Sequence, residues 1–250
     1  MGKVRVFLCL SVIAMFLFMA TGVATAGPVK TNLYGLDGLF LATGGSTIPA
    51  GELVLGASML IISYDVVDGT TLPVTVTYGV SNDIEVAGAF EVNKSFDGPG
   101  GDDSGTGDLF LSGKIAFLEA NSDYPATALG LRLKLPMADD PLSTEETDVA
   151  IFVASEIDMK GVIGILNVEY LIAGGDFENQ VNYVVALQIP FSDTTDFSLE
   201  LMDNELTGDL FAGGATFDLG SAVNFGVAVG FGLNDNAADF AAMGKFDFTF

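Results

Sequence analysis

The residues of this chain that could carry out chemistry are carboxylates and a few cations, because the sequence contains no histidine and only one cysteine. Without histidine, a hydrolase that activates serine with an imidazole base is excluded. Zinc, haem and iron–sulfur sites lack their usual nitrogen and sulfur ligands. We therefore expect no enzyme activity and no cofactor.

The charged residues alternate with apolar residues along extended segments. From Leu129 to Leu135, every second residue is a leucine, and the residues between them include Arg132 and Lys134. Successive side chains of a strand point to opposite faces, so the leucines share one face and the cations the other. The same alternation assigns twelve polar residues to one predicted sheet face: Glu85, Glu91, Lys114, Arg132, Lys134, Glu156, Asn167, Glu169, Gln188, Glu200, Lys245 and Asp247.

Segments with this alternation recur along the chain and are separated by Gly, Asp, Asn, Ser or Pro, a pattern typical of membrane barrel strands. We count about twelve, of which the ninth and tenth have the weakest pattern. The predicted strands are 52–64, 72–80, 84–93, 108–119, 127–136, 148–158, 162–173, 180–190, 197–204, 209–218, 223–233 and 239–250.

The connections between these strands alternate in length, and the segments 94–107 and 137–147 are the notable long, acidic ones. Bacterial membrane barrels have an even strand count, short periplasmic turns and longer outer loops. A cation that faces lipid at the bilayer midplane costs about 2–4 kcal/mol, so in a barrel the leucine face must be the lipid face. A water-soluble sandwich with the opposite orientation also fits the alternation, but it leaves both chain ends unexplained.

The amino terminus has the pattern of a signal peptide. Lys3 and Arg5 precede an apolar run from Val6 to Val23, and small residues follow up to Ala26. We predict cleavage after Ala26 and Sec-type export; the alternative is an inner-membrane anchor. Cleavage leaves no cysteine and removes two of the nine basic residues, which gives a formal charge of 7 − 33 = −26.

The carboxyl terminus alternates Phe246, Phe248 and Phe250 with polar residues, two positions after Gly244. This end resembles the signal by which bacterial outer-membrane β-barrels are recognised by their assembly machinery. It predicts a location in the outer membrane, with the assembly machinery, membrane lipid and lipopolysaccharide as partners. The strong acidity argues against nucleic acid as a partner, because no basic patch exists to displace counterions from phosphates.

Two segments do not fit the strand pattern. Residues 27–51 are rich in glycine and are predicted to be irregular, lying either in the periplasm or inside the barrel as a plug. Residues 52–250 form the predicted barrel. The Gly-rich and Asp-rich loop 97–108 could bind Ca²⁺ through Asp97, Asp102 and Asp103, but it lacks the spacing of a known calcium loop, and a solvated loop is favoured.

A family resemblance lies between Gly105 and Asp140. It rests on Gly105, Gly107, Asp108, Leu109, Leu111, Gly113 and Lys114, and then on Ala128, Leu129, Gly130, Lys134, Leu135 and Pro136. These residues resemble the central motif of the outer-membrane transporter family associated with meta-pathway phenol degradation. Gly38, Leu39 and the string 47–51 resemble the amino-terminal part of that family. Met137 and Ala138 depart from it, since relatives often have Thr and Gly there. The resemblance implies a barrel that passes small, hydrophobic compounds.

The sequence therefore predicts a transmembrane antiparallel up-and-down barrel with two possible functions. The first is a passive pore or transporter for small molecules. The second is a closed structural or surface-interaction barrel whose acidic loops meet lipopolysaccharide through divalent cations. The polar lumen residues are predicted to form ion pairs that satisfy buried charge, and the alternative is a pathway for ions or solutes.

Overall fold

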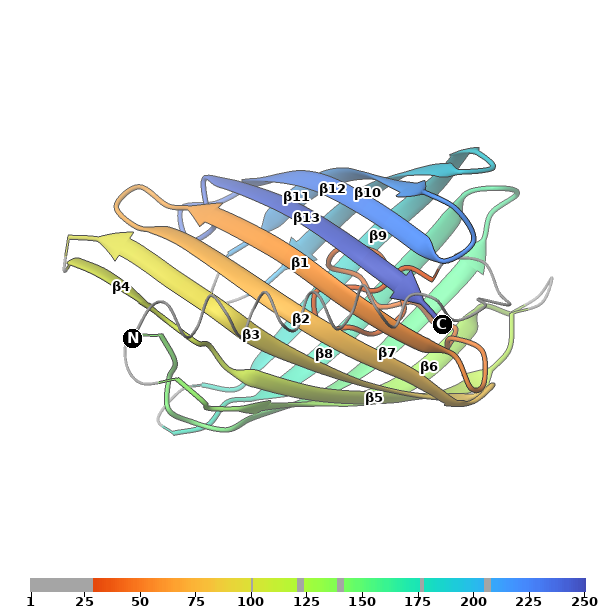
Figure 1. The fold of residues 1–250 in the computed structure, drawn as a ribbon, viewed down its shortest axis with the longest axis horizontal. Helices are drawn as coiled ribbons and strands as arrows, with labels where there is room; N and C mark the ends of the chain where they lie inside the picture. Colours follow the sequence, from red (N-terminus) through yellow and green to blue (C-terminus); the bar gives the residue numbers. More distant parts are fainter. Residues whose placement is uncertain (1–28, 100, 121–123, 139–141, 176–177, 205–207) are drawn as a thin grey trace.

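The computed structural model describes residues 29–99, 101–120, 124–138, 142–175, 178–204 and 208–250. The predicted signal peptide, residues 1–26, lies outside these ranges. Thirteen strands form one antiparallel sheet, and twelve of them close into a barrel because β1 pairs with β13 while β2 pairs with both β1 and β3 (Figure 1). The strands are β1 (Leu53–Ser63), β2 (Asp68–Ser81), β3 (Ile84–Gly98), β4 (Gly101–Gly105), β5 (Leu109–Leu118), β6 (Ala126–Leu135), β7 (Asp148–Asp158), β8 (Ile163–Ile172), β9 (Gln180–Ser192), β10 (Thr195–Asp203), β11 (Leu210–Asp218), β12 (Val223–Gly232) and β13 (Phe240–Thr249).

The predicted all-β barrel is confirmed, since each of the twelve predicted strands coincides with a barrel strand. One predicted loop is wrong. The segment 94–107 is largely a hairpin, in which β3 continues to Gly98 and pairs with the extra strand β4. Its Gly-rich and Asp-rich composition is typical of a loop, but cross-strand backbone hydrogen bonds do not depend on apolar side chains.

The second strand begins at Asp68 rather than at the predicted Leu72. Pro73 lies inside it and has no N–H to donate to a neighbouring strand. The β2–β3 register shifts between Leu72 and Pro73. The predicted strand contains Pro73 but begins four residues too late, and so omits the Gly- and Thr-containing segment that precedes the register shift.

The two faces of the wall differ in exposure. Leu111 is 42% exposed on the outer surface, whereas the next residue, Ser112, is 8% exposed and faces the lumen. The same holds along β6, where Leu129 and Leu131 are exposed and Gly130 is buried. An outer surface covered by leucine, isoleucine, valine and phenylalanine suits lipid rather than water. No helix within the described ranges is long and apolar enough to cross a membrane.

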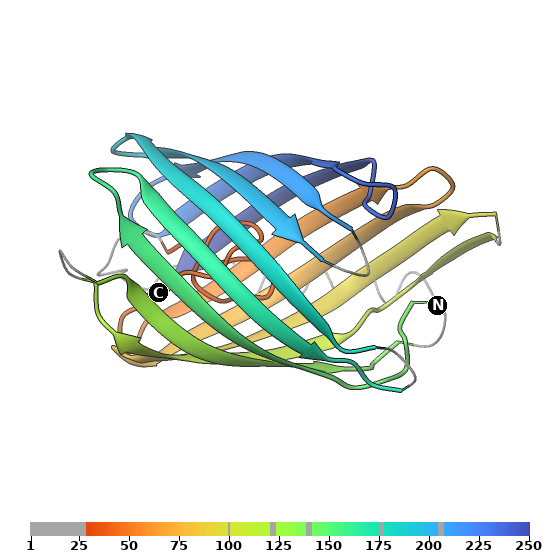
Figure 2. The same ribbon diagram turned by 180° about the vertical axis from the view of Figure 1, so that it is seen from behind.

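The barrel has two distinct ends. At the turn end, short connections join β2 to β3, β7 to β8, β9 to β10 and β11 to β12, and the chain finishes at Phe250. At the loop end lie the β1–β2 connection, the β3–β4 hairpin and the β6–β7, β8–β9, β10–β11 and β12–β13 connections. Residues 29–51, here called the plug, lie inside the barrel toward the turn end, as both views show (Figures 1 and 2).

Candidate functional site

The plug is a compact, irregular segment. It contains only isolated bridges, between Thr31 and Asp37 and between Gly38 and Thr43. Gly35 has a φ of +88°, in the left-handed region that favours glycine. At Gly45 a Cβ atom would lie 2.3 Å from the carbonyl oxygen of Ala126 on β6. Glycine therefore lets this segment both turn and approach the barrel wall closely.

The plug packs its apolar side chains against small residues of the wall. Leu36 contacts the cluster that includes Ala87 and Ala154, and Leu39 contacts Ala186. Phe40 packs in the same way against Ala212, Ala228 and Met243. Alanine on the lumen face leaves space that larger side chains would fill, so this part of the barrel accommodates an inserted segment.

Wall carboxylates accept hydrogen bonds from the plug backbone. Glu200 on β10 receives three consecutive N–H groups, from Phe40 at 3.2 Å, Leu41 at 2.8 Å and Ala42 at 2.9 Å. Glu85 on β3 receives those of Asp37 and Ile48 at 2.8 and 2.9 Å. A buried irregular segment has few partners within itself, and each unpaired backbone group would be costly. These carboxylates supply the missing acceptors.

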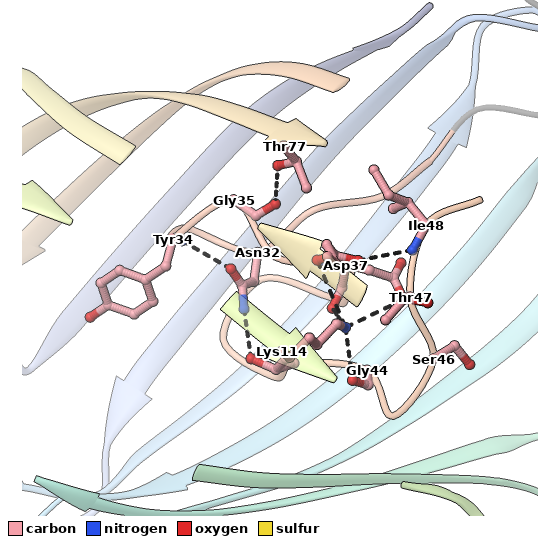
Figure 3. A network of polar contacts seen from close by, with 12 residues as sticks. Asn32, Tyr34, Gly35, Asp37, Gly44, Ser46, Thr47, Ile48, Thr77 and Lys114 are labelled. Atoms are coloured by element: carbon pink, nitrogen blue, oxygen red, sulfur yellow. Dashed lines mark hydrogen bonds and ion pairs between the residues drawn. The ribbon is translucent and has the colours of Figure 1, made fainter. Parts of the chain in front are cut away.

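Wall lysines do the same for the plug carbonyl groups. The Lys114 ammonium donates to the carbonyl oxygens of Gly44 at 3.0 Å and Asp37 at 3.3 Å (Figure 3). It also lies 3.9 Å from Glu85 Oε1 and 3.9 Å from Asp37 Oδ2. Lys245 donates to the carbonyl oxygens of Thr31 and Leu39, and its Nζ lies 3.7 Å from Asp247 Oδ2. Each lysine thus holds both a backbone group and a carboxylate.

The amino-terminal part of the plug is bound to the last strand. Asp247 on β13 accepts from the Thr31 N–H at 3.1 Å and from the Thr31 hydroxyl at 2.6 Å. The Thr249 hydroxyl accepts from the Val29 N–H at 3.0 Å. On β8, the Asn167 side chain both accepts from and donates to the Thr43 backbone, at 2.7 Å each. The plug is therefore attached to widely separated parts of the wall.

A cavity of about 280 Å³ lies beside the plug, with Lys30, Asp37, Glu156 and Gln188 among its lining residues. Glu156 Oε1 accepts from the Ser46 hydroxyl at 3.3 Å. Lys30 and Gln188 both bind the Asp196 carboxylate. Burial raises the pKa of the Asp37 carboxyl above its ordinary value, and the Lys114 and Lys245 ammonium groups oppose that rise. The plug thus does not fill the lumen completely.

Tyr34 marks the boundary of the plug toward the loop end. In Figure 3 its ring points away from Asp37 and Lys114. The Arg132 guanidinium carbon lies 3.9 Å from the centre of the Tyr34 ring, a stacking geometry. Arg132 also pairs with Glu169, whose other oxygen accepts from Asn182 Nδ2 at 3.2 Å. At this level a wall cation contacts the plug through a ring rather than through the backbone.

Nearer the loop end, the charges of the wall pair with one another. Lys134 Nζ lies 2.9 Å from Asp148 Oδ2 and 3.9 Å from Asp108 Oδ2. Lys94 Nζ lies 3.4 Å from Glu91 Oε2. These side chains come from neighbouring strands or from one strand, so they need no inserted segment. They line the part of the lumen that the plug does not reach.

The structure separates the twelve predicted lumen residues into two sets. One set contacts the plug or lines its cavity: Glu85, Lys114, Glu156, Asn167, Gln188, Glu200, Lys245 and Asp247. The other set pairs mainly within the wall: Glu91, Arg132, Lys134 and Glu169. Sequence reasoning did not identify Thr31, Asp37, Asp148 or Thr77, whose hydroxyl donates to the Gly35 carbonyl oxygen. In the sequence, the signal for an inserted segment is that small alanines share the lumen face with the charged residues, which leaves space inside that part of the barrel.

The remaining predicted sites lie on the surface. Asp97 and Asp102 face each other across the β3–β4 pair, and Asp103 lies next to Asp102. In the described part of the chain, no three His, Cys, Asp or Glu residues are arranged to hold a metal ion. On β13, the ring centre of Phe246 lies 4.7 Å from that of Phe225 on β12. Gly244 and Phe248 lie two positions before and after Phe246 in the same strand. Beyond the end of the strand, Phe250 exchanges backbone hydrogen bonds with Leu53.

Solved bacterial outer-membrane proteins share this architecture. The COG4313 outer membrane channel from Pseudomonas putida F1 matches with a TM-score of 0.65 at 14% identity, over 82% of this chain and 97% of that one. The KdgM porin in complex with disordered oligogalacturonate gives 0.55 at 9% identity, over 80% and 99%. The NanC porin gives 0.53 at 11% identity, over 78% and 98%.

The fold is that of a bacterial outer-membrane β-barrel. No protein-family model and no curated protein matches the sequence. At these identities the likeness shows the fold alone.

Proposed function

We propose that this protein is a passive, non-enzymatic channel for small molecules, narrowed by the plug at the turn end. The observation that supports this most strongly is the uneven filling of the lumen. The plug occupies one half but leaves a cavity of about 280 Å³ beside it, and ion pairs line the other half. The similar folds of one channel and two porins agree with this function.

The solutes in this proposal are small and include hydrophobic compounds. The motif resemblance between Gly105 and Pro136 to the phenol-degradation transporters favours such solutes. An apolar part of the lumen also supports them, since Leu33 and Leu41 of the plug and Leu60 of β1 pack around Phe40 and Met243. The opposite part carries Arg132 and its partners. A molecule with an apolar ring and one polar group would find both kinds of surface.

The cellular setting of the proposal follows from the chain ends. Residues 1–26 act as a Sec-type signal and are removed, and the strand ending at Phe250 is read by the barrel-assembly machinery. The turn end then faces the periplasm and the loop end faces outward, where acidic loops meet lipopolysaccharide.

The alternative is a closed structural barrel, and the saturation of the plug backbone by wall side chains favours it. Planar-bilayer recordings and liposome swelling distinguish the two, using the signal-cleaved protein and a variant that lacks residues 29–50. Discrete conductance of the full-length protein, increased in the variant, supports the channel. Conductance of the variant alone identifies a closed barrel. Absence of conductance from both the full-length protein and the variant, each shown to be a folded barrel, rejects a pore.

A further inference from the structure

The connections at the loop end carry charges of one sign only. Every charged residue in the six segments that join strands at the loop end is Asp or Glu, and none is Lys or Arg: 64–67, 99–108, 136–147, 173–179, 204–209 and 233–239. A solute that enters from this end first meets a negative potential. Such a potential raises the local concentration of cations and lowers that of anions.

The strand register concentrates acidic groups further at one side of the loop end. Asp68 of β2 pairs with Asp97 of β3, and Asp97 pairs with Asp102 of β4. Three carboxylates therefore lie in a row across neighbouring strands, an arrangement of like charges that strand pairing ordinarily avoids. All three residues are exposed to solvent. Their side chains lie on the outer face of the wall, since Asp68 alternates in phase with the exposed Val76 and Tyr78 of β2, so they act on the entrance only at a distance.

The lumen cations are not free to pair with an anionic solute. In the described part of the lumen and plug, each lysine and arginine is already paired with a carboxylate: Lys30, Lys94, Lys114, Arg132, Lys134 and Lys245. An anionic solute would have to displace one of these carboxylates. A cationic solute meets carboxylate oxygens that exceed the cations in number.

The cavity beside the plug has the same bias. A Cβ atom at Gly44 would lie 2.9 Å from Glu156 Oε2 and 3.0 Å from Asp37 Oδ2, so these two carboxylates approach each other beside Gly44. Lys30, which also lines the cavity, is paired with Asp196. The cavity beside the plug is thus bordered by acidic groups, as the loop end is.

We infer that the pathway acts as a charge filter, which admits cations, organic amines and uncharged molecules and rejects carboxylates and other anions. This inference rests on the proposed channel function and specifies the class of its solutes. Two groups of carboxylates produce this charge selectivity. The row of Asp68, Asp97 and Asp102 acts at long range, and the carboxylates of Asp37 and Glu156 act by contact.

The test is the zero-current potential of the full-length, signal-cleaved protein in a planar bilayer under a KCl gradient. We expect K⁺ to be about fivefold or more as permeant as Cl⁻ at low salt. Liposome swelling should show faster entry of lysine than of glutamate, two amino acids of similar size. Conductance with equal or greater Cl⁻ permeability overturns the filter and leaves the channel function intact. Absence of all conductance overturns both.

Two variants distinguish the contributions of these two groups of carboxylates. The combination Asp97→Asn with Asp102→Asn should lower the K⁺ preference at low salt only, because the Debye length falls from about 10 Å at 0.1 M to about 3 Å at 1 M salt. Glu156→Gln keeps an acceptor for Ser46 and should lower the preference at both salt concentrations. The control Asp193→Asn removes one exposed charge at the turn end and should leave the ratio unchanged. An unchanged ratio in both test variants would contradict the assignment to these carboxylates.

Discussion

In the half of the lumen nearest the turn end, Glu200 and Lys114 bind the backbone of the plug, whereas in the other half Arg132 and Lys134 bind carboxylates of the wall. All four are charged residues on the lumen face of strands. The partners differ, and so does the burial. The Lys114 side chain is 0% exposed, while those of Arg132 and Lys134 are 15% and 14% exposed.

This difference shows that charged lumen side chains can supply the hydrogen bonds that secondary structure would otherwise give to the backbone of a neighbouring segment. The plug is too short and too irregular to satisfy its own N–H and C=O groups, so wall side chains complete them. Near the loop end, Asp108 accepts from the Met137 N–H and the Ser143 hydroxyl of the β6–β7 connection, but Arg132 and Lys134 pair with wall carboxylates. Substitutions should therefore be costly in the plugged half and mild in the open half.

The largest effect is expected for Lys114→Ala. It leaves the Glu85 and Asp37 carboxylates without their cation and two plug carbonyl groups without a donor. The free energy of unfolding in detergent should fall by about 3–5 kcal/mol, as for other broken buried pairs. The matched control is Lys134→Ala in the open half. Equal losses for the two lysines would contradict the difference between the halves.

The next effect is expected for Glu200→Ala, which removes the acceptor of three backbone N–H groups. A loss of about 2–3 kcal/mol should follow, since buried unpaired donors are costly. Hydrogen exchange should accelerate at the amides of Phe40, Leu41 and Ala42 before it does in the strands. Glu200→Gln retains one carbonyl acceptor and should give an intermediate rate. Unchanged exchange in Glu200→Ala would show that the plug does not depend on this carboxylate.

A smaller loss is expected at the boundary between the halves, for Arg132→Ala. The substitution removes the contact with the Tyr34 ring and the pair with Glu169, both partly exposed. Stability should fall by about 1 kcal/mol, and single-channel conductance should rise because the lumen widens there. Arg132→Lys tests the ring contact, because lysine keeps the charge but loses the planar group. A loss as large as that of Lys114→Ala would move the boundary toward the loop end.

The smallest effect is expected for the pair of Lys134 and Asp148. A double-mutant cycle with Lys134→Ala and Asp148→Ala should give a coupling energy of about 0.5 kcal/mol, typical of a partly exposed ion pair. Raising the salt concentration should reduce it further. A coupling above about 2 kcal/mol would show that the open half is as tightly organised as the plugged half.

Much of the barrel could be predicted because its strands obey a local rule. Leu111 and Ser112 must face lipid and lumen respectively, and this requirement appears in the sequence as strict alternation. The closing strand was recognisable for the same reason, since Phe246 and Asp247 alternate in the same way. The hairpin of β3 and β4 was missed because β4 consists only of Gly, Asp and Ser and so shows no apolar alternation.

The plug could not be located from the sequence because its position depends on contacts between distant residues. Glycines 35, 38 and 44 predict turns but no direction, and the segment has no periodicity to match against the wall. The pairing of lumen charges was also only partly accessible. The predicted carboxylate Glu156 contacts Ser46 rather than a lysine, because the hydroxyl comes from the inserted plug.

The attachment of Thr31 to Asp247 joins residues separated by 216 positions in the chain. Neither this contact nor the one between Val29 and Thr249 can form until the last strand has arrived. The first strand, β1, begins directly after the plug and must pair with that same last strand. The attachment of the amino-terminal part of the plug therefore forms only once the last strand is present, whereas the contacts of the plug with Glu85 and Lys114 need only earlier strands.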